Sequence, residues 1–223
     1  MTLRALLIAA LLAGPAAADV PASPSAAPPA TLVSGTPARG AKLDPVFKLL
    51  EQQRLACKFA EQKHVALLAR PLTSTGTIVF ERDKGIVRAV LTPKPQMVVL
   101  TKTSLKIVKG KTVEEIPLEK SKDLKAFAMI FPTLLRGERA ALEKSFDIGL
   151  YGSDADWWAL TFAPKSEALK KFVKTVTVVG KKTDVVALRV VEASGDSTDT
   201  QLTDVRRNKD VPDTEIAAAF GAN

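Results

Sequence analysis

The chain has 223 residues, which suits one domain with a substantial hydrophobic core, and its formal net charge is +8 at pH 7. Its basic residues are spread along alternating strand-like positions, and only two tryptophans and one tyrosine could stack on bases, so the composition disfavours nucleic-acid binding. With a single cysteine, Cys57, the chain cannot form an internal disulfide, and we expect this thiol to be buried.

Catalytic motifs are missing from the sequence. It has no nucleophile elbow, no glycine-rich phosphate loop and no cluster of metal ligands, so no metal or cofactor is expected. The only histidine, His64, lies seven residues after Cys57, and an odd separation on one strand places two side chains on opposite faces. We therefore interpret the chain as a protein other than an enzyme.

The N-terminus has the pattern of an export signal. A basic Arg4, an apolar stretch and the small residues at 16–18 predict a signal peptide over 1–18, so the mature protein is expected to be soluble and periplasmic. Residues 19–41 are rich in proline, alanine and serine and predict a flexible tether. The remaining 42–223 are expected to form one domain.

The first predicted element of that domain is a helix. Asp44 is expected to be its N-cap and Pro45 its first residue. Apolar residues recur on one face of the predicted helix, at Val46, Phe47, Leu50 and Cys57.

Short apolar-alternating stretches separated by proline and glycine turns follow, and they predict antiparallel strands. Before residue 121 they cover about 58–69, 74–82, 85–92, 96–102, 104–109 and 111–117. After residue 144 they cover about 145–152, 156–163, 172–179, 184–193 and 199–206. The pattern predicts a large, partly closed antiparallel sheet of about 11 strands.

Between the two sets of strands the spacing becomes helical. From Ser121 onward apolar residues recur every three or four positions, and Pro132 is expected to kink or split this helix. A second short helix is predicted over 138–144, after Gly137.

Several stretches carry a family resemblance when they are taken in order. They are Phe59-Ala60-Glu61-Gln62-Lys63, the strands from Ile78 to Thr101, Phe131-Pro132-Thr133-Leu134-Leu135, Trp157-Trp158-Ala159-Leu160-Thr161 and Val211-Pro212-Asp213. Together they resemble the LolA-type periplasmic lipoprotein carriers. The resemblance implies a mainly β fold with an α lid, namely a curved, unclosed antiparallel β-barrel whose open side is covered by helices.

The same resemblance implies the site. Acyl chains would lie on the concave face and under the lid, against Ile78, Phe80, Ile86, Arg88, Val90, Phe127, Met129, Ile130, Phe131 and Trp157. Arg82 matches the family arginine that bonds toward the lid in the closed state. Ile86 and Arg88 depart from the family, which has an aromatic residue and a tryptophan there, and the chain is similar to a divergent branch.

The resemblance also implies partners: an acylated lipoprotein or other acyl-lipid cargo, an inner-membrane exporter and an outer-membrane acceptor, with the carrier a monomer. Three functions stay open at this point. The first is a lipoprotein chaperone between the two membranes. The second is a carrier of a free glycolipid or polyene lipid, and the third is an envelope enzyme acting on such lipids. Arg88 either faces the cavity and favours a polar headgroup, or lies in water.

Overall fold

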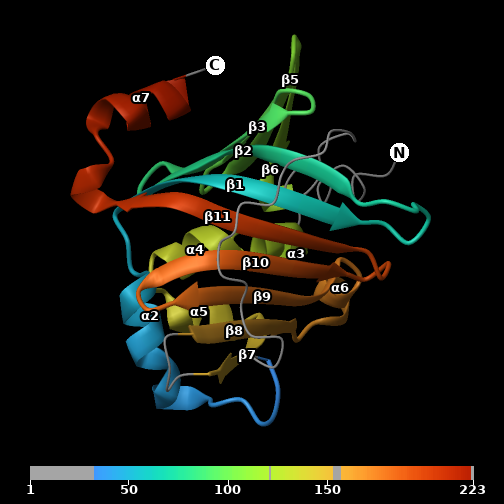
Figure 1. Cartoon of the computed structure of the whole chain (residues 1–223), viewed down its shortest axis with the longest axis vertical. Coiled ribbons are helices and arrows are strands. Elements are labelled where there is room, and N and C mark those ends of the chain that lie inside the picture. Colours follow the sequence, from blue (N-terminus) through green and yellow to red (C-terminus); the bar gives the residue numbers. More distant parts are fainter. Residues whose placement is uncertain (1–32, 121, 153–156, 222–223) are drawn as a thin grey trace.

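The computed structural model describes residues 33–120, 122–152 and 157–221 (Figure 1). The predicted signal peptide over 1–18 lies outside the described residues, as does the part of the predicted 19–41 tether that precedes residue 33. The described remainder of that segment pairs with the domain, because the backbones of Ala38 and Leu150 exchange both of their hydrogen bonds.

One antiparallel sheet of eleven strands dominates the molecule, in the order β6-β5-β4-β3-β2-β1-β11-β10-β9-β8-β7. Its two edge strands, β6 and β7, are not paired with each other, so the sheet stays open, as the sequence predicted. The strands are β1 (Arg54–His64), β2 (Leu72–Glu81), β3 (Gly85–Thr92), β4 (Gln96–Leu100), β5 (Ser104–Lys109), β6 (Thr112–Pro117), β7 (Phe146–Tyr151), β8 (Trp157–Pro164), β9 (Val173–Lys181), β10 (Asp184–Glu192) and β11 (Ser197–Arg207).

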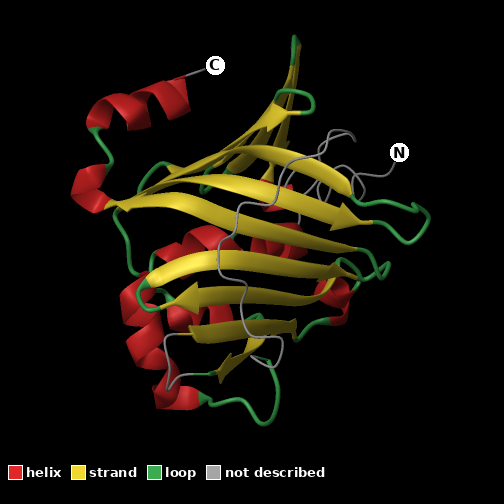
Figure 2. Ribbon diagram, viewed as in Figure 1, coloured by secondary structure: helices red, strands yellow, loops and turns green. Residues whose placement is uncertain are grey.

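The helices are short. They are η1 (Gly40–Leu43), α2 (Asp44–Leu50), η2 (Leu118–Lys120), α3 (Lys122–Ala128), α4 (Ile130–Leu135), α5 (Arg139–Glu143), α6 (Glu167–Lys170), η3 (Asn208–Asp210) and α7 (Asp213–Gly221). Figure 2 shows most of them behind the lower part of the curved sheet, whereas α7 stands apart at its upper left.

Tight turns make the neighbouring strands antiparallel. At the turn between β2 and β3, Gly85 has a φ of 123°, and a side chain there would overlap the backbone oxygen of Leu100 on β4. Only glycine tolerates both the conformation and the close approach of β4.

The main hydrophobic core lies on the concave face of the sheet. There the inner side chains of β1–β3 and β7–β11 pack against α2, α4 and α5. A second cluster joins β4, β5 and β6 to Ala128 and Met129, at the junction of α3 and α4. The helices therefore cover the open side of the sheet, as the fold prediction stated.

The sequence prediction for the first helix was wrong at both ends. The chain makes the 3₁₀ turn η1 first, Leu43 is the N-cap of α2, and Asp44 instead pairs with Arg139. The helix ends at Leu50, and Cys57 lies in β1. The helical spacing from Leu50 to Cys57 was a coincidence. Cys57 is an inner residue of a strand, and its distance of seven residues from Leu50 happens to equal two helical turns.

The predicted break in the middle helix is confirmed. We call α3 and α4 the lid helices; they are separate, and Met129 lies between them. Pro132 has no N–H to donate to the carbonyl of Ala128, so a continuous helix would lose a bond at this junction.

The C-terminal helix α7 covers the opposite, convex face of the sheet. Its Ile216 packs with Val211, which follows η3, and with Ala56 and Val79, which alternate with inward-facing residues of β1 and β2. Arg206 on β11 donates to both carboxylate oxygens of Glu215 in α7. The lid helices and α7 therefore lie on opposite faces of the sheet.

Candidate functional site

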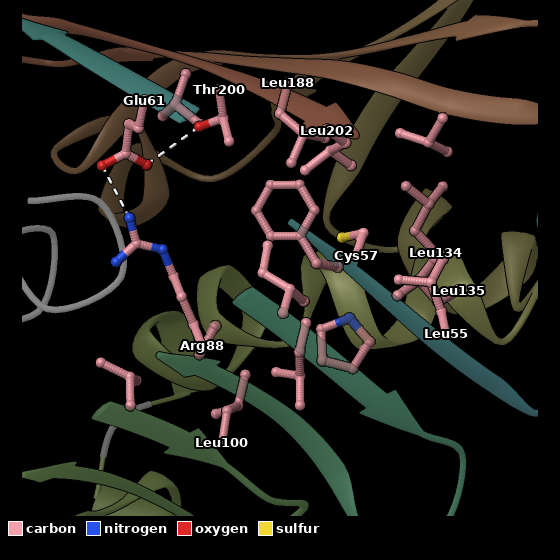
Figure 3. Close-up of a pocket in the computed structure, with 18 residues that line it drawn as sticks. Leu55, Cys57, Glu61, Arg88, Leu100, Leu134, Leu135, Leu188, Thr200 and Leu202 are labelled. Carbon is pink, nitrogen blue, oxygen red and sulfur yellow. Dashed lines mark hydrogen bonds and ion pairs between the residues drawn. The ribbon is translucent and has the colours of Figure 1, made fainter. Parts of the chain in front are cut away.

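A cavity of about 90 Å³ lies between the concave face of the sheet and α4 (Figure 3). Its wall comes from strands β1–β4, β10 and β11 and from the lid helices. The lining residues are Leu55, Cys57, Glu61, Ile78, Ile86, Arg88, Val98, Leu100, Ala128, Phe131, Pro132, Leu134, Leu135, Val185, Leu188, Val190, Thr200 and Leu202.

The lining is apolar except at one end. Figure 3 shows Glu61, Arg88 and Thr200 grouped there, away from Leu55, Leu134 and Leu135. Arg88 is 7% exposed and Glu61 is 4% exposed, so a charged pair is enclosed in the wall of the cavity. Such a pair persists only where its charges are matched and its polar atoms are hydrogen-bonded.

Three donors hold the Glu61 carboxylate. Arg88 Nη2 donates to Oε1 at 2.9 Å, and Ser74 Oγ donates to the same oxygen at 3.2 Å. Thr200 Oγ1 donates to Oε2 at 3.1 Å. The donors come from β3, β2 and β11, on either side of Glu61 in β1, so the strand register fixes this cluster.

Arg88 is also held against an aromatic ring. Its guanidinium carbon lies 4.3 Å from the centre of the Phe59 ring, a cation–π distance. Gly76 is opposite Phe59 in β2, and a side chain at Gly76 would approach the Phe59 ring to 2.7 Å. The glycine therefore leaves the space in which the ring lies beneath Arg88.

Burial also shifts the pKa values of two side chains in the cavity wall. Desolvation raises the pKa of the Glu61 carboxyl above its usual value, and the charge of Arg88 opposes this rise. Desolvation likewise raises the pKa of Cys57 to about 12, which bears out the prediction of a buried thiol.

Four of the residues predicted to bind acyl chains line the cavity: Ile78, Ile86, Arg88 and Phe131. The sequence left two orientations open for the Arg88 side chain, and in the structure it faces the cavity. Four others are buried in the main core beside the cavity, namely Phe80, Val90, Phe127 and Ile130.

The two remaining residues lie elsewhere. Met129 is half-buried and packs against the second cluster. Trp157 is half-buried under the ammonium group of Lys181, and its neighbour Trp158 is the one that faces the core. Trp158 packs against Gly180 and donates its indole N–H to the backbone oxygen of Lys182 at 2.8 Å.

Arg82, predicted to link the sheet to the lid, does reach the helical side. Its Nη1 donates to the backbone oxygen of Arg136, at the end of α4, over 3.4 Å. The same nitrogen lies 3.6 Å from Glu51 Oε1, just after α2. Arg82 therefore connects the end of β2 to the segments that bound α2 and α4.

Sequence reasoning missed the β1, β10 and β11 sides of the wall, including Glu61 and Leu188. The alternation along β1 carried a signal, because Glu61 falls in the inward set with Leu55 and Cys57. What the sequence did not supply was the pairing of β1 with β11, 139 residues apart at Glu61 and Thr200.

Among the described residues, no group of histidine, cysteine, aspartate and glutamate side chains has the arrangement of a metal site. Within the same residues, no helix has the length and hydrophobicity needed to span a membrane.

The fold and site define a class: an open antiparallel sheet that encloses an apolar cavity under short helices. The chain belongs to the family of LolA-like outer membrane lipoprotein carrier proteins, whose model matches residues 36–220. None of the curated proteins matches the chain.

Several solved structures are similar to this chain. A LolA superfamily protein from Nitrosomonas europaea is 10% identical, with a TM-score of 0.44, and the match covers 81% of this chain and 97% of that one. A DUF1329 family protein from Desulfovibrio piger is 12% identical, with a TM-score of 0.42 and coverage of 79% and 98%. A chain of the Pseudomonas aeruginosa MucA/MucB complex is 12% identical, with a TM-score of 0.44 and coverage of 78% and 58%.

Proposed function

We propose that this protein is a periplasmic carrier that shields the acyl chains of a lipoprotein and moves them from the inner to the outer membrane. The observation that carries the proposal is the cavity between the concave sheet and the lid helices, whose wall is apolar over most of its area. Membership in the LolA-like family supports the same conclusion.

The energetics of the cargo explain why such a wall is needed. Burial of one methylene group is worth ~0.8 kcal/mol, so a long acyl chain leaves a membrane at a cost on the order of 10 kcal/mol. The side chains of Leu55, Leu188 and Leu202 line the cavity from three adjacent strands and supply part of the apolar surface that would replace the membrane. A non-directional surface of this kind accepts chains without specific contacts.

The cavity must enlarge before it can hold this cargo. Its volume of about 90 Å³ is below the roughly 300–1,000 Å³ of typical ligand pockets. Phe131, Leu134 and Leu135 of α4 close it from the helical side. On this proposal the observed arrangement is the closed form, and loading requires the lid helices to move away from the sheet.

A carrier of a free lipid is the second candidate. The buried Arg88–Glu61 pair in the cavity wall supports it, because the polar headgroup of a free lipid would find polar partners beside the acyl-chain surface. The two candidates share the fold and the lid movement, and they differ in what the acyl chains are attached to.

Native mass spectrometry of the protein purified gently from its own cell envelope tests the function directly. A co-purifying acylated protein supports lipoprotein transport, and a bound free lipid supports the second candidate. If the protein is empty and also fails to take up acyl lipids in vitro, the carrier function is wrong.

A substitution in the cavity makes the test specific. Leu188 is half-buried and lines the cavity from β10, so Leu188→Arg should reduce acyl-lipid binding at least tenfold, because it places a charge against the acyl chain. Leu91→Arg is the matched control: Leu91 is 57% exposed and does not line the cavity. Equal binding by the two variants would show that cargo does not use this cavity. Circular dichroism and thermal unfolding check that both variants remain folded.

A further inference from the structure

Buried polar side chains gather at one end of the concave face. Ten polar or charged residues among the described ones are buried, and eight of them belong to this end. Seven of the eight lie where strands begin or end at this side of the sheet: at the C-terminal ends of β1 and β10 and at the N-terminal ends of β2, β4 and β11. The eighth, Arg88, lies in the middle of β3, and its side chain reaches Glu61. We call these eight residues the polar end; they are Glu61, Lys63, Ser74, Arg88, Gln96, Glu192, Thr198 and Thr200.

The charges of the polar end are balanced in two ion pairs. Arg88 pairs with Glu61 at 2.9 Å, and Lys63 Nζ lies 2.7 Å from Glu192 Oε1. No cation is left over to neutralise an anion. A charged group that entered would have to displace one of the two carboxylates from its partner.

Hydrogen-bond donors, by contrast, are left over. Three buried side-chain polar atoms of the described residues have no hydrogen-bond partner, and all three belong to the polar end: Arg88 Nη1, Gln96 Nε2 and Thr198 Oγ1. Buried polar atoms are nearly always bonded, so such a concentration calls for an explanation. Two of the three are N–H groups that can only donate.

The two N–H donors are neighbours in the sheet. Arg88 is opposite Val98 and Val90 is opposite Gln96, so Arg88 and Gln96 are diagonal neighbours on the inner faces of β3 and β4. Arg88 is 93% buried and lines the cavity, at the end of the apolar wall. Gln96 does not line the cavity itself but is the diagonal neighbour of Arg88, so an oxygen-bearing group attached to an acyl chain in the cavity would meet Arg88 first, with Gln96 next to it.

We propose that the polar end binds the uncharged ester group at the head of a glyceryl acyl chain, with Arg88 Nη1 and Gln96 Nε2 donating to its oxygens. The inference rests on the proposed carrier function and names the chemistry of its cargo. Ester oxygens accept hydrogen bonds and carry no charge, so they satisfy the free donors while both ion pairs stay intact. A carboxylate or phosphate would compete with Glu61 for Arg88.

The test compares three probes of similar chain length: 1-monooleoylglycerol, oleate and 1-octadecene. Each displaces the fluorescent dye N-phenyl-1-naphthylamine from the full mature protein, and the displacement curves give dissociation constants. We expect the glyceryl ester to bind more tightly than the hydrocarbon and the anion. If all three fail to bind, the proposed function itself is wrong. If the hydrocarbon or oleate binds as tightly as the ester, only the polar-end proposal is overturned.

The decisive variant is Gln96→Leu. It removes an unpartnered buried donor, so it should fold at least as stably as the wild-type protein. It should also weaken binding of the glyceryl ester by roughly three- to tenfold and leave the hydrocarbon unaffected. Gln62→Leu is the matched control, because Gln62 is exposed on the outer face of β1. Unchanged ester binding by Gln96→Leu, or an equal loss for ester and hydrocarbon, would overturn the proposal.

A charge-neutral second variant tests Arg88. The double substitution Glu61→Gln with Arg88→Met removes both members of the ion pair and leaves no unpaired buried charge. It should lose the preference for ester over hydrocarbon, and a preserved preference would contradict the proposal.

The same ester occurs in two kinds of cargo, and a further comparison separates them. One probe is a synthetic peptide that begins with diacylglyceryl-cysteine, and the other is free dioleoylglycerol. Gln96→Leu should weaken both. A wild-type preference for the lipopeptide indicates a lipoprotein source, and a preference for the free lipid indicates a glycerolipid.

Discussion

At the scale of single residues, Cys57 reports on the state of the cavity. It lines the wall, is 4% exposed, and burial raises its pKa to about 12. Thiol reagents attack the thiolate, so the folded protein at pH 8 should react with Ellman's reagent roughly a thousandfold more slowly than the protein unfolded in guanidinium chloride. Absorbance at 412 nm measures both rates. Comparable rates would show that the cavity wall is open to solvent in the empty protein.

Arg88 shows how far the sequence predicted the site. Its alternation with Ile86 and Val90 offered the inward orientation as one of two possibilities, and the structure has that one. Its partner Glu61 could not be identified, because the contact crosses β2 and depends on the register of three strands. Side-chain periodicity is local information, whereas the pairing of charges across a sheet is not.

At the scale of elements, Arg82 links the sheet to the helical side through the carbonyl of Arg136 and the carboxylate of Glu51. In the proposed carrier these contacts hold the closed state, so Arg82→Leu should destabilise that state by up to about 1 kcal/mol. Binding of monooleoylglycerol should then tighten by up to about fivefold, mainly through slower release, which stopped-flow dye displacement measures.

The matched control for Arg82 is Arg206→Leu. Arg206 makes a similar link between β11 and α7, but on the convex face, so its loss should leave the release rate unchanged. If release is unchanged in both variants, Arg82 has no part in holding the carrier closed.

The elements also show why the fold was predicted better than the cavity. Most strand boundaries followed from turns such as the one at Gly85, where the chain itself marks the reversal, but the first strand, predicted over about 58–69, is β1 at Arg54–His64. The division of α3 from α4 followed from Pro132. Which of the apolar lid residues line the cavity did not follow, because Phe127, Ile130 and Phe131 share one apolar face and differ only in packing against the sheet.

At the scale of the whole molecule, the cavity of about 90 Å³ has to enlarge if the protein carries acyl chains as proposed. The lid helices are the candidates. They have seven and six residues, and helices this short depend on packing for their stability. Strand β1 is paired on both sides, with β2 and β11, in the middle of the sheet. The molecule therefore combines a rigid concave sheet with a cover of low intrinsic stability.

Hydrogen exchange followed by mass spectrometry distinguishes the two parts. Amides of residues 122–135 should exchange faster than those of β1, because local opening of the lid helices costs less free energy than disruption of the central strands. Addition of monooleoylglycerol should change exchange in 122–135 and leave β1 unaffected. Helix α7 is the internal control: it is also short but covers the convex face, so its exchange should not respond to cargo. If α7 responds and the lid helices do not, cargo enters from the convex face and the cavity under α4 is only part of the core.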